Sequence, residues 1–210
     1  ASWSRGLGDV YKRQVIGTLF LSSLAGYSLA MHRFKLNLLV FAMFIAGNFV
    51  PYQILMIPVR NISIELGMYN SHMGLIIFHI AFQTGFCTFF LRNFIKELPF
   101  ELIEAARADG ATEWTIYRKI IIPLTIPALA ALGVLEFTFI WNDYFWALIL
   151  TQGDTVKPIT VGLDVLRGQW TTAWNLVSAG SVVAALPPVI MFFILQRQFI
   201  QGLTFGAVKG

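Results

Sequence analysis

The chain has 210 residues, of which 57% are hydrophobic and only 12% are charged. A soluble domain has about 25% charged residues, so this chain has too little polar surface to cover a water-soluble globule, and its length bounds the number of membrane spans instead. The net charge of +4 comes from basic residues scattered between apolar runs, and without a basic patch it does not indicate nucleic acid as a partner.

Residues 1–14 differ from the rest of the chain. They read ASWSRGLGDVYKRQ, and the part GLGDVYKRQ looks like translated sequencing-adapter read-through. We expect residues 1–14 to be a non-native lead without a function, and the true N-terminus to be lost. An ordinary polar lead-in is the alternative interpretation.

Three membrane spans are predicted before residue 100. A membrane helix needs about 20 mostly apolar residues, and stretches of this kind without Asp, Glu, Lys or Arg lie at 14–32, 36–59 and 66–91. Because internal proline is tolerated in membrane helices, Pro51 and Pro58 predict kinks in the second span more than breaks.

The most polar stretch follows the third predicted span and reads EAARADGATEWTIYRKIIIP at residues 104–123. Pro99 suits a helix start and Gly110 suits a left-handed helix end, so we expect a short helix between them. Ile103 and Ala106 share one face of this helix, and Leu102 and Ala105 widen it. The alanines make part of that face shallow enough for close approach of another protein.

A second short helix is predicted directly after Gly110. Thr112 can cap it, and Glu113 lies in its first turn, where the helix dipole favours an anion. We call residues 99–119 the elbow. On physical grounds it is either a docking element for a protein or an amphipathic loop that lies on the lipid headgroups.

Two further spans are predicted at 120–150 and 168–196, which makes five in total. The first of them contains acidic residues, which are costly in a membrane and usually face a protein interior or a water-filled path. We therefore predict a possible lining of a translocation path, and the alternative is a polar packing cluster near the outer interface. The residues concerned are Glu136, Trp141, Asn142 and Asp143.

The basic residues predict the orientation, because cytoplasmic loops of membrane proteins are enriched in Lys and Arg. Nine of them fall on the side that holds the elbow and the C-terminus, and we expect that side to be cytoplasmic. These nine are Arg33, Lys35, Arg92, Lys96, Arg107, Arg118, Lys119, Arg197 and Lys209. The opposite side holds Arg60, Lys157 and Arg167, besides the basic residues of the suspected lead.

Sequence motifs typical of nucleotide hydrolysis, acyl hydrolysis and metalloproteases are missing from the sequence. It contains no G-x-x-x-x-G-K-[ST] phosphate loop, no G-x-S-x-G and no H-E-x-x-H. His72 and His79 are expected to lie far from any second metal ligand, and Cys87 is the only cysteine. We therefore predict that this chain is not an enzyme and has no catalytic residue, no metal site and no cofactor of its own.

The elbow resembles the EAA loop of ABC-importer permeases. That loop has Glu-Ala-Ala, then Gly, then Ile and Pro at fixed spacing, and this chain matches it with Glu104, Ala105, Ala106, Gly110, Ile120 and Pro123. The usual Leu before the proline is Ile122 here. The resemblance implies a coupling helix that sits in a groove on the ATP-binding subunit and transmits nucleotide-driven closure to the membrane helices.

The resemblance covers nearly all of residues 15–210. SLAGYSLAMHRFK, VPYQILMIPV, WNDYFWALIL and the tail QRQFIQGLTFGAVKG are similar to the maltose- and glycerol-phosphate-type carbohydrate permeases, in particular to the shorter of their two permease subunits. It implies an all-α integral membrane permease domain over 15–210 that normally has six spans. With five predicted here, the first span would be missing.

The resemblance also implies the partners and the location. They are a second permease, an ATP-binding dimer that holds ATP-Mg, and an extracytoplasmic binding protein that delivers the solute to outer loops including 151–175. The location is the prokaryotic cytoplasmic membrane. A non-sugar solute is one alternative, and an ion-coupled secondary transporter that uses Glu136 and Asp143 is another. A membrane-embedded enzyme would need a nucleophile or metal constellation that the sequence lacks.

Overall fold

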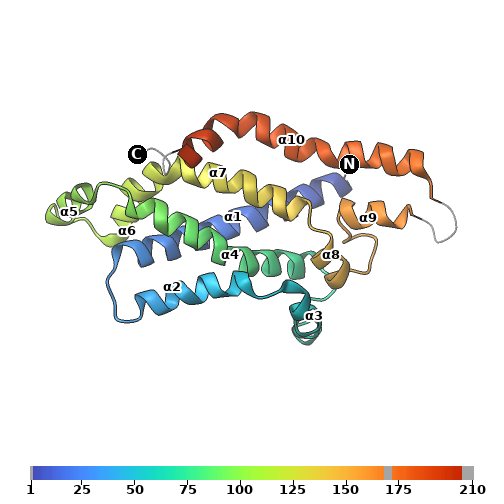
Figure 1. Cartoon of the computed structure of the whole chain (residues 1–210), viewed down its shortest axis with the longest axis horizontal. Coiled ribbons are helices and arrows are strands. Elements are labelled where there is room, and N and C mark those ends of the chain that lie inside the picture. Colours follow the sequence, from blue (N-terminus) through green and yellow to red (C-terminus); the bar gives the residue numbers. More distant parts are fainter. Residues whose placement is uncertain (1, 168–171, 205–210) are drawn as a thin grey trace. The chain divides into compact units, whose positions relative to one another are not determined.

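The computed structural model describes residues 2–167 and 172–204, and the named elements of these residues are all helical (Figure 1). The α-helices are α1 Ser2–Met31, α2 Asn37–Ala46, α3 Met56–Glu65, α4 His72–Lys96, α5 Phe100–Ala108, α6 Glu113–Ile116, α7 Ile122–Trp141, α8 Phe145–Leu150, α9 Ile159–Val165 and α10 Trp174–Thr204. The described residues also form two short 3-10 helices, η1 Gly47–Phe49 and η2 Tyr52–Leu55, and one short π-helix, η3 Tyr117–Ile121. The predicted all-α class is confirmed.

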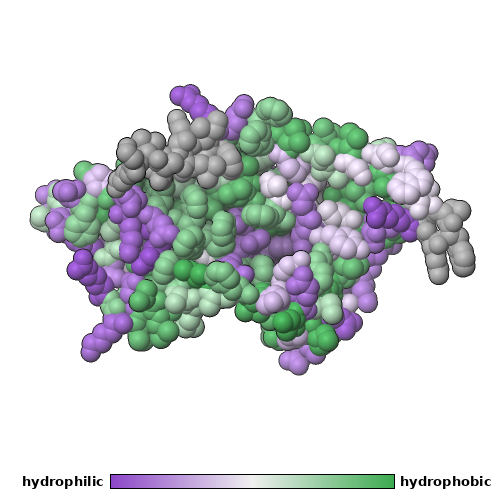
Figure 2. Space-filling view, in the orientation of Figure 1, coloured by the Kyte–Doolittle hydropathy of each residue, from purple (hydrophilic) through white to green (hydrophobic). Residues whose placement is uncertain are grey.

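Four helical segments of the described residues are long and apolar enough to cross a membrane, and a bent pair of helices raises the number to five. The four are Gly8–Met31, His72–Lys96, Glu113–Trp141 and Trp174–Arg197. Apolar side chains are exposed on the bent pair and on the last of the four segments: Leu38 and Phe49 of the pair expose 73% and 80% of their surface, and Ile194 exposes 67%. Figure 2 shows hydrophobic side chains over much of the visible face and hydrophilic ones gathered around α5 and α6. Such a surface suits lipid, not water.

The second predicted span is not one continuous helix, and this part of the prediction is wrong. The pair Asn37–Phe49 and Tyr52–Glu65 is bent sharply at a short break. Pro51 at the break has extended backbone, with φ −57° and ψ 113°. Proline lacks the N–H that would continue the helix and pushes the residue before it out of the helical region.

The fourth predicted span begins earlier and ends earlier than expected. α6, η3 and α7 form one candidate span from Glu113 to Trp141. Its η3 part is a π-helix, a wider turn that interrupts the α-helical pattern. Because the span ends at Trp141, Asp143 lies in the turn before α8 and not inside a membrane helix.

The chain divides into two compact units. The first contains residues 1–16, 50–82 and 134–194, and the second contains residues 17–49, 83–133 and 195–210. The second unit has a large apolar core that includes Leu91, Ile103 and Ile116. A smaller core in the first unit joins Leu75, Leu150 and Val156. The elbow therefore belongs to the second unit, and Glu136 and Asp143 belong to the first.

Residues 1–14 are part of the long helix α1 where they are described. That they are a non-native lead stays a prediction. Of the tail that resembles the carbohydrate permeases, residues 205–210 lie outside the described residues.

Candidate functional site

The elbow has the geometry that its sequence predicts. Pro99 precedes α5, and Gly110 follows it with a left-handed φ of +78°. Thr112 then caps α6, because its hydroxyl accepts a hydrogen bond from the Thr115 N–H at 3.3 Å. Gly110 is needed at its position because only glycine adopts this backbone without strain. The predicted helix–glycine–helix arrangement is confirmed.

The two faces of α5 have different environments. Ile103 is 1% exposed and belongs to the core of the second unit, and Ala106 packs against that same core. Glu104 and Ala105 are exposed, and Leu102 exposes 48% of its surface. The face predicted to meet a partner is therefore divided: Ile103 and Ala106 pack against this chain's own core, whereas Leu102 and Ala105, which widen that face, are exposed. Glu104 and Ala105 form the open side of α5.

Ile120 and Pro123, the last members of the EAA-like pattern, lie beyond the elbow. Ile120 is in η3 and packs against the core of the second unit. Pro123 is the second residue of α7, which continues directly from η3 within one candidate span, and it is exposed. Ile120 and Pro123 join the elbow to the span, whereas Glu104 and Ala105 lie on the open side of the elbow.

Glu113 is the main polar contact of the elbow, and the sequence prediction missed its role. Arg107 donates two hydrogen bonds to its carboxylate, at 2.9 Å and 3.3 Å, and Tyr27 donates a third at 2.6 Å. His32 Nε2 lies 3.3 Å from the same carboxylate. The hydrogen bond to Glu113 raises the pKa of the Arg107 guanidinium above its usual value. The sequence indicated only that an acid suits the first turn of a helix.

In the first unit, three of the predicted path residues form hydrogen bonds within the unit. Trp141 donates its indole N–H to the Ala184 carbonyl at 2.8 Å, and Asn142 donates to the Thr138 carbonyl at 2.8 Å. Asp143 accepts from the backbone N–H groups of Trp146 at 3.3 Å and Ala147 at 2.9 Å, so it caps the start of α8.

Glu136, the fourth predicted path residue, is fully buried, at 0% exposure. An acid inside a candidate span without exposure to solvent is unusual and is often retained for function.

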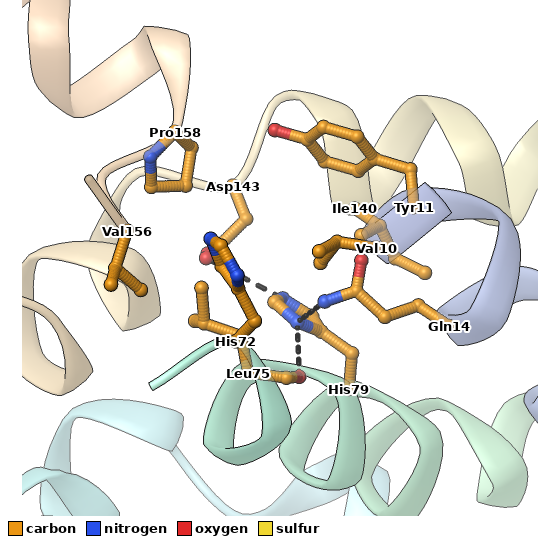
Figure 3. A pocket seen from close by; sticks show the side chains of 10 residues that line it. All are labelled: Val10, Tyr11, Gln14, His72, Leu75, His79, Ile140, Asp143, Val156 and Pro158. Carbon is orange, nitrogen blue, oxygen red and sulfur yellow. Dashed lines mark hydrogen bonds and ion pairs between the residues drawn. The ribbon is translucent and has the colours of Figure 1, made fainter. Parts of the chain in front are cut away.

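Asp143 also meets His79, which corrects the prediction that His79 lies far from any second metal ligand. His79 Nε2 lies 3.4 Å from Asp143 Oδ2, and its Nδ1 lies 3.0 Å from both Gln14 Nε2 and the Leu75 carbonyl. His72 lines the same pocket, as Figure 3 shows. The pocket has a volume of about 10 Å³, which is room for one water and not for a sugar. Within the described part of the chain, no group of three His, Cys, Asp or Glu side chains could hold a metal ion.

The comparison with known proteins gives one family. The profile described as "Binding-protein-dependent transport system inner membrane component" matches residues 20–205. The chain is 36% identical to the arabinooligosaccharides transport system permease protein AraQ of Halalkalibacterium halodurans, over 93% of this chain and 70% of that protein. It is also 36% identical to the melibiose/raffinose/stachyose import permease protein MelC of Bacillus subtilis, over 100% of this chain and 79% of that protein.

Solved structures share the fold. A chain in the crystal structure of a bacterial ABC transporter involved in the import of the acidic polysaccharide alginate matches with a TM-score of 0.68 and 22% identity. The match covers 95% of this chain and 79% of that one. At this level of identity the likeness concerns the arrangement of helices alone.

Proposed function

Because the chain belongs to the family of inner-membrane components of binding-protein-dependent transport systems, we propose that it is the permease subunit of an ATP-driven importer for a carbohydrate. The solute class is supported by the names of its relatives, which are transport proteins for arabinooligosaccharides and for melibiose, raffinose and stachyose. The permease carries out no hydrolysis. ATP-Mg is bound by a partner, since this chain has no phosphate loop.

The elbow is the observation that carries this proposal. It presents the exposed face of the short helix α5 beside a left-handed glycine. Four long helical segments of the described residues are instead apolar enough to span a membrane. We assign polar contacts with the ATP-binding subunit to Glu104, close approach to Ala105, and the turn to Gly110. Ala106, Ile120 and Pro123 hold the elbow against the membrane helices.

Transport would proceed by alternating access. A binding protein delivers the solute to the outer loops, including residues 151–175, of which 168–171 lie outside the described residues. ATP closes the ATP-binding dimer on the cytoplasmic side, α5 moves with it, and the membrane helices of this chain and of a second permease reorient. Glu136, Trp141, Asn142 and Asp143 are the residues that we propose for the path.

The direct test is copurification of the complete native transporter from mild detergent. The wild-type chain is expected to bring down an ATPase and a second permease, and Gly110→Val is expected to lose the ATPase. A Cβ at Gly110 would meet no other atom within 4 Å, so the loss would come from the left-handed backbone, which costs a non-glycine residue about 1–2 kcal/mol. Gly110→Asn should retain more ATPase, because Asn tolerates that conformation.

Gly67 offers a matched control for this substitution. It has a left-handed φ of +66° and open space around its Cβ position, but it lies in the first unit, outside the elbow. Gly67→Val should therefore keep the ATPase bound. Equal loss of the ATPase in both variants would mean that backbone strain anywhere disrupts the complex, and the elbow assignment would fail.

Energy coupling separates the proposal from an ion-coupled transporter. Uptake of labelled raffinose, lactose or another sugar that the wild-type takes up should stop on ATP depletion and continue in the presence of an uncoupler. The reverse pattern would favour an ion-coupled mechanism, with Glu136 and Asp143 as its acidic residues.

A further inference from the structure

Glu113 joins three helical elements of the second unit through one carboxylate. It is the first residue of α6 and of the candidate span that continues to Trp141. Arg107 reaches it from α5, across the Gly110 turn, with two hydrogen bonds. Tyr27, near the end of α1, donates to it at 2.6 Å. The elbow is thus attached at the same point to the helix that follows it and to α1.

The contact with α1 continues along the span. The Ser23 and Tyr117 hydroxyls lie 2.6 Å apart, and the rings of Tyr27 and Tyr117 are 5.4 Å apart. Tyr117 begins the π-helix η3, which lies between α6 and α7. Two residues of α1, one turn apart, therefore hold the first two turns of the span that leaves the elbow.

α1 in turn packs closely on α4. A Cβ at Gly26 would lie 3.1 Å from the Arg92 backbone nitrogen, and Arg92 Nε donates to the Leu29 carbonyl at 3.4 Å. There is little room at Gly26 for the two helices to slide independently. A displacement of α1 in the second unit would therefore act on α4 as well.

We propose that Glu113 is the positioning residue that makes α5, the start of the span and α1 move as one body when the ATP-binding subunit displaces α5. This inference rests on the proposed function and names the side chain through which the elbow acts. Without Glu113, apolar packing through Ile103 and Ala106 alone would hold α5 to α1, and less of the movement of α5 would reach α1.

A merely stabilising role is a weaker account of the same contacts. The side chains of Glu113 and Arg107 are 45% and 33% exposed, and exposed ion pairs contribute little to folding stability because water screens them. These bonds instead fix the orientation of Arg107 and Glu113 relative to each other, since two hydrogen bonds from a guanidinium to a carboxylate constrain both groups.

The test is the ratio of sugar transported to ATP hydrolysed, measured on the complete transporter in proteoliposomes with its binding protein. The probe is labelled raffinose, lactose or another sugar that the wild-type transports. Glu113→Ala is expected to keep the ATPase bound and hydrolysing, because Glu104 and Ala105 are unchanged, while the ratio falls about tenfold, as for the loss of a hydrogen bond to a charged group. Tyr27→Phe and Arg107→Gln should each lower the ratio about threefold, since each removes part of the same contact.

The matched control is Lys35, an exposed charged side chain of the second unit that lies outside the elbow. Lys35→Ala should leave the ratio unchanged. An unchanged ratio in Glu113→Ala would overturn the inference, and so would loss of ATPase binding in that variant, because Glu113 would then only maintain the docking face. Failure of the wild-type to bind any ATPase would instead overturn the proposed function.

Discussion

Asp143 has two tasks that a single substitution can separate. Its carboxylate caps α8 by accepting from the Trp146 and Ala147 N–H groups, and it lies 3.4 Å from His79. The two N–H groups bond to different oxygens of the carboxylate, and because Asn has one oxygen it can keep one of the two bonds, for example the shorter one to Ala147. A role in the translocation path, or in the contact with His79, depends on the charge.

We therefore expect Asp143→Ala to lower the free energy of unfolding by about 1–2 kcal/mol through the lost cap. Asp143→Asn keeps one of the two capping bonds, so it should lower the thermal midpoint of the detergent-solubilised protein less than Asp143→Ala does, while it still lowers sugar uptake. Glu65→Gln, a substitution at an exposed acidic side chain of the same unit, is the control and should change neither quantity. Normal uptake by Asp143→Asn would remove Asp143 from the path and leave it a structural cap.

Asn70 shows how a single residue can connect distant segments. It has a left-handed φ of 54°, and its side-chain oxygen accepts from the N–H groups of Gln152 and Gly153, both at 2.8 Å. Asn is one of the few side chains that tolerate this backbone. Through it the turn before α4 holds the start of the loop that follows α8.

Among the elements, α2 and α4 are in unusually close contact. A Cβ at Gly85 of α4 would lie 2.6 Å from the Phe44 carbonyl oxygen of α2. Because that atom belongs to the backbone, it cannot move without moving the helix. Glycine at 85 is therefore a requirement of packing, as is common where membrane helices approach closely.

Gly85→Ala should lower the free energy of unfolding by about 1–3 kcal/mol through overpacking, which lowers the thermal midpoint by about 2–4 °C per kcal/mol for a chain of this length. Gly133→Ala is the matched control within the same unit, since its Cβ would lie 3.6 Å from Leu19, an ordinary contact. That variant should be neutral or slightly stabilised, because Ala favours helix over Gly. A similar loss in both variants would contradict the packing argument.

The elbow and the second predicted span differ in how well local sequence predicted them. Pro99, Gly110 and Thr112 act within a few residues of themselves, so their effects on α5 and α6 could be predicted. Pro51 acts locally too, but a proline in an apolar helix can either bend or interrupt it. The surrounding packing decides between the two, and here the pair of helices is sharply bent.

At the scale of the whole molecule, the fifteen basic residues divide between the two units. The nine predicted to be cytoplasmic fall in the ranges of the second unit, and Lys209 among them lies outside the described residues. The other six fall in the first unit: Arg5, Lys12, Arg13, Arg60, Lys157 and Arg167. The elbow belongs to the same unit as the nine, and its cytoplasmic orientation stays a prediction.

Cysteine labelling in spheroplasts tests this orientation. The natural Cys87 is the only cysteine and is fully buried, so it should give no background with a membrane-impermeant maleimide. Asp154→Cys should be labelled from outside. Phe34→Cys, at a side chain that is exposed near Arg33 and Lys35, should be labelled only after the membrane is permeabilised. Labelling of the second variant from outside would reverse the assigned topology.

The sequence by itself determined the membrane class, the number of apolar segments, the elbow and the family resemblance, because each rests on composition or on spacing over a few turns of helix. The tertiary structure alone decided which face of α5 is open, that Glu113 binds Tyr27, and that His79 meets Asp143. Tyr27 and Glu113 are 86 positions apart, and His79 lies in α4 whereas Asp143 lies in the turn before α8. Contacts of this kind arise from packing between elements, and no local periodicity contains them.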